Sequence, residues 1–428
     1  MNRLTVVVIL GIIVFADGVA AQTPPIPERL SLREAVQLAT ERNPQAAAAR
    51  ALVAIAEASR VDAGLRPIPA VSLESEGYPL FDPPRPSFLD GQELTIRYDQ
   101  EIETGDRRQL RTEAAAAGVT VATLTARDRL RRLELAVRRA YLQLALAQAD
   151  TDVARTSLEE IDRVLAVSRE RVSVGEAARS EVSRLQVERL RFAEDAFSAD
   201  LALKNARAAL LTLLGATILT QAIQATDSLS GVSPGGTVQV STTPNPVSQA
   251  PAQGDQRPDL LAAREEVRRA ETETRLQRAL RSPNVTLGGG YKRDFGTNAV
   301  VFGVTIPLTF WNKNQGGIAR AAAEQRVIAS NLASVELDVR LDIQQAQNSV
   351  DVNRARADYI ERQVLASARE SRDVVSESYR LGAMDLIDFL DAQRAFRDTL
   401  RTYNRALFDY RVSLFELDAA LGLSSVQQ

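Results

Sequence analysis

The sequence predicts a mainly α-helical protein with a small β part, assembled from two similar halves. Ala, Leu, Arg, Glu and Val dominate its 428 residues and only 5% are aromatic, a composition typical of long helices and coiled coils. Two long stretches, 106–173 and 317–380, contain no proline. Each follows a pair of segments in which apolar and polar side chains alternate, which is the pattern of β-strands.

The two halves are related by an internal duplication. A spacing of 207 residues, without a gap, aligns Gly175 with Gly382, Glu181 with Asp388, Gln186 with Gln393 and Gly215 with Gly422. Matched landmarks at one spacing are the signature of a repeated structural unit. We therefore expect the second half of the chain to repeat the fold of the first.

The composition excludes most enzyme chemistry. The chain has no cysteine and no histidine, and its formal net charge is −3. Disulfides, thiolate or imidazole metal sites and histidine-based triads are therefore impossible, and no phosphate loop of the Walker kind occurs. The charges are spread along the helices without a basic face, which argues against nucleic-acid binding. We expect no catalytic activity, no cofactor and no resident metal.

Residues 1–21 have the form of a secretory signal peptide. Arg3 precedes an apolar run, and the small residues Val19, Ala20 and Ala21 stand before Gln22, as at a cleavage site. We expect cleavage near Ala21 and export of the mature chain from the cytoplasm.

The first repeat is expected at 22–215. Ser31 and Glu34 have the spacing of a capping box at a helix start, and Asn43-Pro44 restarts the helix because Asn at the N-cap and Pro at the first position are favourable. The elements predicted after these helices are a β-hairpin (68–103), a long helix (106–173) and a return helix (178–214). At ~1.5 Å per residue the long helix spans roughly 100 Å, so it must pack lengthwise against other helices.

The second strand of this hairpin has two chemically different faces. One face carries Leu94, Ile96, Tyr98 and Ile102, and the other carries Glu93, Thr95, Arg97, Asp99 and Glu101. The strand is as long as a membrane-spanning strand. If it does span a membrane, the charged face lines a wet lumen and the apolar face contacts lipid. A soluble hairpin with one polar face fits the alternation as well, so the pattern leaves both open.

A linker rich in Thr, Ser, Pro, Gly and Gln is predicted at 216–256, before a second repeat at 257–428. The elements expected in this repeat are a helix, a β-hairpin (284–308), a long helix (317–380) and a return helix (385–421). Four strands cannot close a barrel, and open sheet edges in lipid leave backbone groups unpaired. If the strands lie in a membrane, several copies of the chain must associate.

Several segments resemble the TolC family of outer-membrane efflux channels: LSLREAVQLATERNP, VGEAARSEV and LGAMDLIDFLDAQ, with return helices that end in LLG and ALG. The segments EIETGDRR and IPLTFWNKNQGGIARA resemble the CzcC-like heavy-metal branch of that family. The resemblance covers essentially the whole mature chain. It implies a homotrimer in which long antiparallel helices form an α-barrel tunnel across the periplasm, and three sets of four transmembrane strands form a 12-stranded β-barrel in outer-membrane lipid.

The resemblance also implies a function. The chain is expected to be a passive conduit of a tripartite efflux system, joined through a periplasmic adaptor to an inner-membrane pump, expected to be proton-driven. The expected cargo is divalent heavy-metal cations. A general drug, small-molecule or protein export channel of the same family is one alternative. A periplasmic coiled-coil adaptor or scaffold is an alternative of another class.

The resemblance assigns roles to residues near two helix turns. Asp388 and Asp391 match the acidic positions that form rings at the family's channel constriction, whereas the pattern alone describes two exposed acids on a helix face. The turns that correspond to the adaptor-docking ends of the family are Val174-Gly175 and Leu381-Gly382.

Glu181 and Tyr379 match positions that hold the family's channel mouth closed, although a surface glutamate and a packed tyrosine fit these positions as well. Arg184, the repeat counterpart of Asp391, is a candidate latch residue that substitutes for an arginine present in some members of the family. Met384 stands where some members have an arginine that helps the latch. We therefore expect a mouth that closes less tightly.

Overall fold

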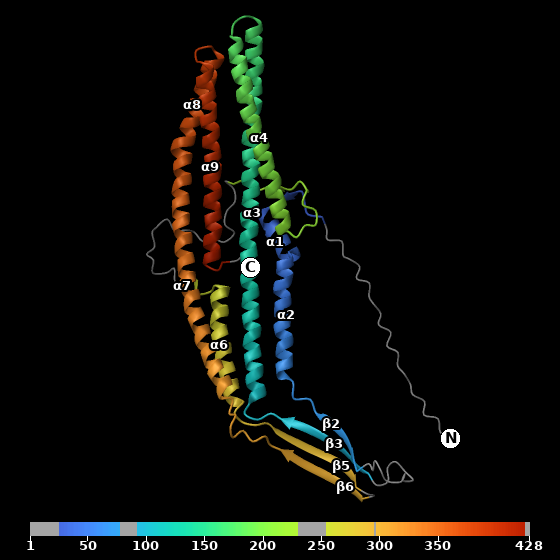
Figure 1. Cartoon of the computed structure of the whole chain (residues 1–428). Coiled ribbons are helices and arrows are strands. Elements are labelled where there is room, and N and C mark those ends of the chain that lie inside the picture. The colour runs from blue at the N-terminus through green and yellow to red at the C-terminus, as the bar shows by residue number, and fades with distance from the viewer. Residues whose placement is uncertain (1–24, 78–91, 230–253, 295–296, 424–428) are drawn as a thin grey trace, which may run out of the picture.

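The computed structural model describes residues 25–77, 92–229, 254–294 and 297–423 as an elongated array of helices with a small sheet at one end (Figure 1). The predicted signal peptide and residues 78–91 of the first hairpin lie outside the described residues, as does most of the 216–256 linker. The long helices run along the length of the molecule, and two helical tips lie at the end opposite the sheet.

Two short helices open the chain. Helix α1 (Leu32–Arg42) begins with the full capping box, because Ser31 Oγ accepts from Glu34 N while Ser31 N donates to the Glu34 carboxylate at 2.8 Å. Helix α2 (Pro44–Gly64) begins at Asn43, whose side-chain oxygen accepts from Gln45 N at 2.7 Å. These caps satisfy backbone donors that a helix leaves free at its N-terminus.

The first long helix and its return helix form an antiparallel pair. Helix α3 (Arg107–Ser173) is continuous over 67 residues, and α4 (Arg179–Leu213) runs back along it. The predicted range for α3 was 106–173; Asp106 itself is a left-handed residue outside the helix, with φ of 57°.

The second long helix is not one regular α-helix. Helix α7 (Gln315–Tyr359) passes into a π-helical segment, η1 (Ile360–Leu365), and continues as α8 (Ala366–Arg380). It follows α6 (Pro258–Ala279) and precedes the return helix α9 (Leu386–Ala420). A single rod over 317–380 was expected, because no proline or glycine inside it signals an interruption. A π-helical turn has no such residue signature.

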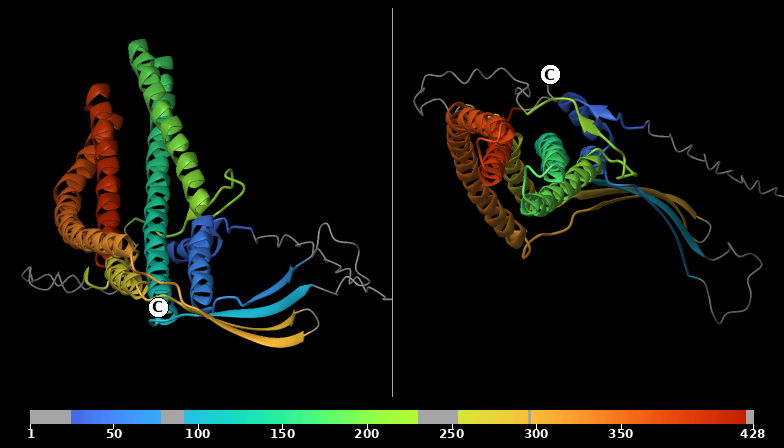
Figure 2. Two further views of the ribbon diagram at one scale, coloured as in Figure 1. Left: turned by 60° about the horizontal axis from the view of Figure 1, so that its bottom comes forward. Right: turned by 90° about the horizontal axis from the view of Figure 1, so that it is seen from above.

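The four longer strands form one antiparallel sheet at the end of the molecule opposite the two helical tips. These strands are β2 (Ala70–Glu76), β3 (Glu93–Ile102), β5 (Val285–Asp294) and β6 (Thr297–Thr305), in the order β2-β3-β5-β6. Strand β3 pairs with β5 over its whole length, from Glu93 opposite Asp294 to Ile102 opposite Val285. The two hairpins of the two repeats are thus joined edge to edge, and the sheet extends to one side of the helices (Figure 2).

The register of the sheet separates the side chains into an apolar and a polar face. Leu73, Ile96, Tyr291 and Val300 stand opposite one another across the four strands, so their side chains share a face. The next row, shifted by one residue, contains Arg97 and Gly290. The apolar face is exposed in this single chain, since Phe302 is 86% and Val300 68% accessible.

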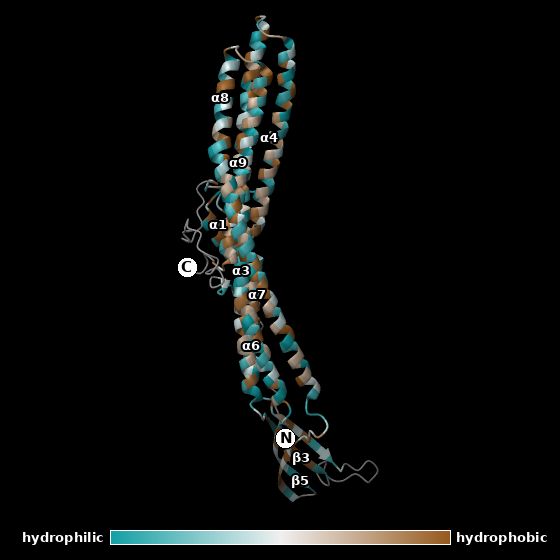
Figure 3. Cartoon of the chain, turned by 90° about the vertical axis from the view of Figure 1, so that its left-hand side faces the viewer, coloured by the Kyte–Doolittle hydropathy of each residue, from teal (hydrophilic) through white to brown (hydrophobic). Residues whose placement is uncertain are grey.

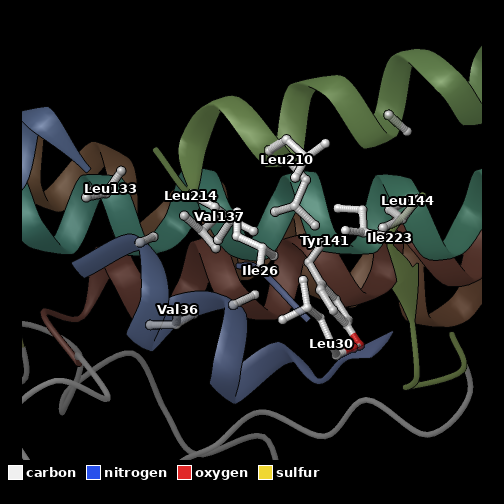
Figure 4. Close-up of a cluster of buried hydrophobic side chains, with 14 of the residues drawn as sticks. Ile26, Leu30, Val36, Leu133, Val137, Tyr141, Leu144, Leu210, Leu214 and Ile223 are labelled. Atoms are coloured by element: carbon white, nitrogen blue, oxygen red, sulfur yellow. Dashed lines mark hydrogen bonds between the residues drawn. The ribbon is translucent and has the colours of Figure 1, made fainter. Parts of the chain in front are cut away.

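The core lies at mid-length, where the N-terminal segment packs on α3 and α4 (Figure 4). Two short strands that the sequence did not reveal, β1 (Arg29–Leu30) and β4 (Gln224–Ala225), pair in parallel there. The hydroxyl of Tyr141 donates to Leu30 O at 2.9 Å, and it lies 2.9 Å from the Asp227 carboxylate.

Hydrophobic and hydrophilic residues alternate along the long helices (Figure 3). Among the helices in the described ranges, none combines the length and the apolar character that a membrane crossing requires.

Candidate functional site

The two helical tips have the same backbone geometry. Gly175 and Gly382 are both left-handed, with φ of 84° and 75°, a conformation that costs little only for glycine. Each glycine N–H bonds three residues back, at 3.2 Å to Val172 O and 3.0 Å to Tyr379 O. The following N–H closes the paired bond that ends a helix in a Schellman motif. Apart from the glycine and its two neighbours in the chain, no described residue has an atom within 4 Å of a Cβ built on either glycine, so both turns project freely.

Below the turns, three helices are joined by a hydroxyl and carboxylate cluster. Tyr379 on α8 donates from its hydroxyl to Glu181 Oε1 on α4 at 2.6 Å. Ser168 on α3 donates to the same oxygen at 3.2 Å and lies 3.2 Å from the Tyr379 hydroxyl. The two predicted latch residues thus meet within one chain, and Ser168 completes the cluster.

Tyr379 is held in this position by packing. Its ring stacks on Phe389 of α9 with centroids 5.0 Å apart, and the residue is 8% exposed. Burial raises the pKa of Tyr379 to about 12, with the neighbouring Glu181 carboxylate acting in the same direction. The hydroxyl therefore remains protonated, and able to donate, throughout the neutral range.

The two predicted constriction acids are exposed but have different surroundings. Both lie in the first two turns of α9. Asp391 accepts from Arg394 Nη1 at 2.8 Å, and Arg394 also pairs with Glu188 of α4 at 3.1 Å. Asp388 forms no ion pair with any described residue. Asp388 therefore carries an uncompensated negative charge near this end, and Asp391 belongs to a network that ties α9 to α4.

Arg184, the candidate substitute in the latch, takes no part in the cluster of Tyr379, Glu181 and Ser168, and its side chain forms no hydrogen bond or ion pair with any residue that the structure describes. It is exposed on α4, and the cation beside Asp391 is Arg394. Met384 lies in the turn before α9, 39% exposed. The predicted docking turns carry bare apolar side chains, Val174 at 62% and Leu381 at 73% exposure.

The predicted lumen residues share the polar face of the sheet, where most of the charged ones are paired. Glu93 forms an ion pair with Lys292 of β5 at 2.7 Å, and Arg97 pairs with Asp99 at 2.8 Å. Glu101 accepts from the Asn284 amide. Thr95 lies between the two charged pairs on the same face.

Three residues near the helical tips were not predicted from the sequence. Ser168 belongs to the cluster with Tyr379 and Glu181, and Glu188 and Arg394 belong to the ion-pair network of Asp391. Ser168 carried a signal in the sequence, because it continues the series of apolar residues Leu158, Ile161 and Leu165, spaced three and four residues apart. In the structure it is 1% exposed. A buried hydroxyl needs a hydrogen-bond partner. Glu188 and Arg394 lie on different repeats, and nothing local in the sequence indicates that they meet.

Comparisons with known proteins agree with this architecture. Residues 254–423 match the family described as outer membrane efflux protein. The chain is 30% identical over 337 residues to the nickel and cobalt resistance protein CnrC of Cupriavidus metallidurans, covering 77% of this chain and 74% of CnrC. It is 24% identical over 334 residues to the cobalt-zinc-cadmium resistance protein CzcC of the same bacterium, covering 77% of each.

A solved structure of CusC, described in connection with transmembrane channel formation, has a similar fold. The TM-score is 0.75 at 18% identity, and the match covers 92% of each chain.

Proposed function

This chain belongs to the outer membrane efflux protein family, and we propose that it is the outer-membrane channel of a tripartite efflux system that exports divalent heavy-metal cations. Membership of an efflux family means that the chain is not an enzyme. The sequence motifs resemble this family and its heavy-metal branch. The similarity to CnrC and CzcC confirms that resemblance.

The main support for the proposal is the two-faced sheet with its open edges. Its strands present one apolar and one polar face in a single register, and β2 and β6 are open edges. Open edges in lipid leave backbone groups unpaired at several kcal/mol each. Three copies of the sheet closed edge to edge make a 12-stranded barrel with the apolar face toward outer-membrane lipid. The open edges require several copies, and the number three is the one that the family resemblance implies. In this homotrimer Glu93, Thr95, Arg97, Asp99 and Glu101 face the lumen.

The helices continue this conduit through the periplasm as a tunnel. In this arrangement the glycine turns lie at the far end, where their exposed Val174 and Leu381 meet a periplasmic adaptor. Export is passive here, because the chain contains no nucleotide-binding motif and the inner-membrane pump supplies the energy.

The acids of α9 suit a cation conduit. Threefold symmetry brings three copies of Asp388 and three of Asp391 around one axis. Like charges ~6 Å apart repel by ~0.7 kcal/mol in water, and by more in a narrow pore, so cations are attracted to the ring. The proposed cargo consists of the metals of the resistance proteins CzcC and CnrC, which are cobalt, zinc, cadmium and nickel.

Single-channel recording in planar bilayers tests the function. The purified protein should conduct as a trimer with a preference for cations. The Asp388→Ala/Asp391→Ala variant should lose part of that preference and its block by divalent cations. Asp152→Ala serves as a control, because this exposed acid lies in the middle of α3, ~30 Å along the helix from the tip.

Two outcomes would overturn parts of the proposal. A wild-type protein that is monomeric and forms no channel contradicts the channel function and favours a scaffold. A channel that protects cells from drugs but not from cobalt, zinc, cadmium or nickel contradicts the cargo alone.

A further inference from the structure

An ion pair lies flat on two glycines in the polar face of the sheet. Arg97 and Asp99 of β3 pair at 2.8 Å, with side chains 35% and 24% exposed. Asp99 stands opposite Gly288 of β5, and Gly288 stands opposite Gly303 of β6. The Arg97 side chain thus extends from its own strand across the next two.

The space that Arg97 occupies exists because neither glycine has a side chain. A Cβ on Gly288 would lie 2.6 Å from Arg97 Nη2 and would collide with Asp99 Oδ1. A Cβ on Gly303 would lie 2.9 Å from the same Nη2. Glycine inside a strand commonly marks such a close approach by another group. An added methyl group would meet only the ends of flexible side chains, so it would displace the ion pair rather than the sheet.

The neighbouring glycines of the same strand have different surroundings. A Cβ on Gly290 would collide with the carbonyl oxygen of Ile96 and lie 3.0 Å from Arg97 Cα. Gly290 is therefore required by the backbone. Gly289 points to the opposite, apolar face, where its Cβ would meet Phe302 at ordinary distances of 3.7 to 3.9 Å.

The charge of this face depends on where Arg97 lies. The register places acidic side chains on the same face of the sheet: Glu74, Glu76, Glu93, Asp99, Glu101 and Asp294. The cations on this face of the strands are Arg97 and Lys292, and Lys292 is engaged by Glu93. The position of the Arg97 side chain therefore decides whether the polar face of the sheet carries a positive charge that no carboxylate neutralises.

We propose that Gly288 and Gly303 form a floor that holds the Arg97 guanidinium against the barrel wall, where Asp99 neutralises it, and that this arrangement sets the cation preference of the barrel lumen. The inference rests on the proposed function, since it takes the polar face as a lumen. Held flat, Arg97 leaves the remaining carboxylates to attract hydrated metal cations. Lifted into the lumen, it would repel them and narrow the passage at three symmetric positions.

The test is a double-mutant cycle on the full-length trimer in planar bilayers, with potassium chloride and then zinc chloride as the probes. Gly303→Ala should lower the cation-to-anion permeability ratio and the unitary conductance by about 1.5-fold or more, because the guanidinium is displaced toward the ion path. Arg97→Gln alone should raise the cation preference, because it frees Asp99. Gly303→Ala should have no further effect once Arg97 is replaced by Gln.

Gly289→Ala is the matched control, because it adds the same methyl group to the opposite face and should leave both ion permeabilities unchanged. Gly288→Ala should reproduce the effect of Gly303→Ala. If Gly303→Ala assembles as a trimer but conducts like wild type, or if its effect persists without Arg97, the glycine floor has no role and the channel function still stands. If the wild-type protein itself forms no channel, the proposed function fails.

Discussion

The two halves of the chain share the order of hairpin, long helix and return helix but differ in chemistry, most clearly where each return helix meets its long helix. At both tips a left-handed glycine closes the same hydrogen-bonded turn. In the first repeat the return helix carries Glu181 and Arg184, and in the second it carries Asp388 and Asp391 at the same spacing. The two turns therefore have the same backbone geometry while the side chains beside them differ. One half supplies the acceptor Glu181 and the other supplies the donor Tyr379.

A second contrast lies at mid-length, where each return helix ends. Helix α4 ends beside Asn43, which precedes α2, and α9 ends beside Arg257, which precedes α6. In the first repeat Asn43 Nδ2 donates to Leu213 O at 2.7 Å. In the second, Arg257 donates to Ala420 O at 3.4 Å and pairs with Asp259 at 2.7 Å and Asp342 at 3.0 Å. The same junction is therefore made by a neutral amide in one repeat and by a buried charge in the other.

The largest expected difference between the repeats is at this junction. Arg257→Ala should lower the free energy of unfolding by about 3 kcal/mol, because it leaves Asp259 without its main partner in a mostly buried site. Asn43→Ala should cost about 1 to 2 kcal/mol through the lost cap and one hydrogen bond. Urea unfolding followed by helical circular dichroism measures both, and Arg184→Ala should stay within about 0.5 kcal/mol as an exposed control. Equal losses at the two junctions would contradict the contrast.

A smaller effect is expected where the second repeat buries an acid. Asp418 occupies the position of Leu211, a core residue of the first repeat that is 0% exposed. Burial raises the pKa of Asp418 from 3.8 to about 6, with the Arg138 guanidinium opposing the shift and Glu134 adding to it. Because the folded pKa is raised, the stabilisation from protonated Asp418 is complete below about pH 4 and lost as the pH rises through about 6.

Asp418→Asn should therefore gain stability relative to wild type between pH 4 and pH 8. The expected relative gain is about 1 to 2 kcal/mol, less than the full shift because the site is not completely buried. Melting temperatures of the two proteins across this range provide the measurement. A variant whose difference from wild type is the same at pH 4 and pH 8 would show that Asp418 does not titrate in this range.

The smallest expected effect is at the hydrogen bond between Tyr379 and Glu181, which is the proposed latch between the two halves of the chain. Tyr379→Phe removes the hydroxyl that donates to Glu181, a loss of about 1 to 1.5 kcal/mol that raises the open fraction of the mouth up to about tenfold. The measurement is the open probability of single channels at neutral pH. Tyr359→Phe, at a tyrosine 57% exposed on α7, is the control. Unchanged gating would mean that Ser168 and the packing of the ring hold the tip without the hydroxyl.

Positions that stop or start helices could be read from the sequence because their physical cause is local. Asn43 caps α2 with its own side chain, and Gly175 and Gly382 adopt a backbone conformation that other residues avoid. The alternation of β3 likewise follows from the geometry of a single strand. The π-helical segment at Ile360–Leu365 had no such local signal.

By itself, the sequence determined the helix boundaries at caps and glycines and the two-faced strands, because each depends on neighbours along the chain. Only the tertiary structure decided that β3 pairs with β5, that Arg394 binds Asp391, and that Arg97 rests on Gly288 and Gly303. These contacts join residues of different strands, helices or repeats. Their partners are selected by packing and register, which no pattern along a single segment encodes.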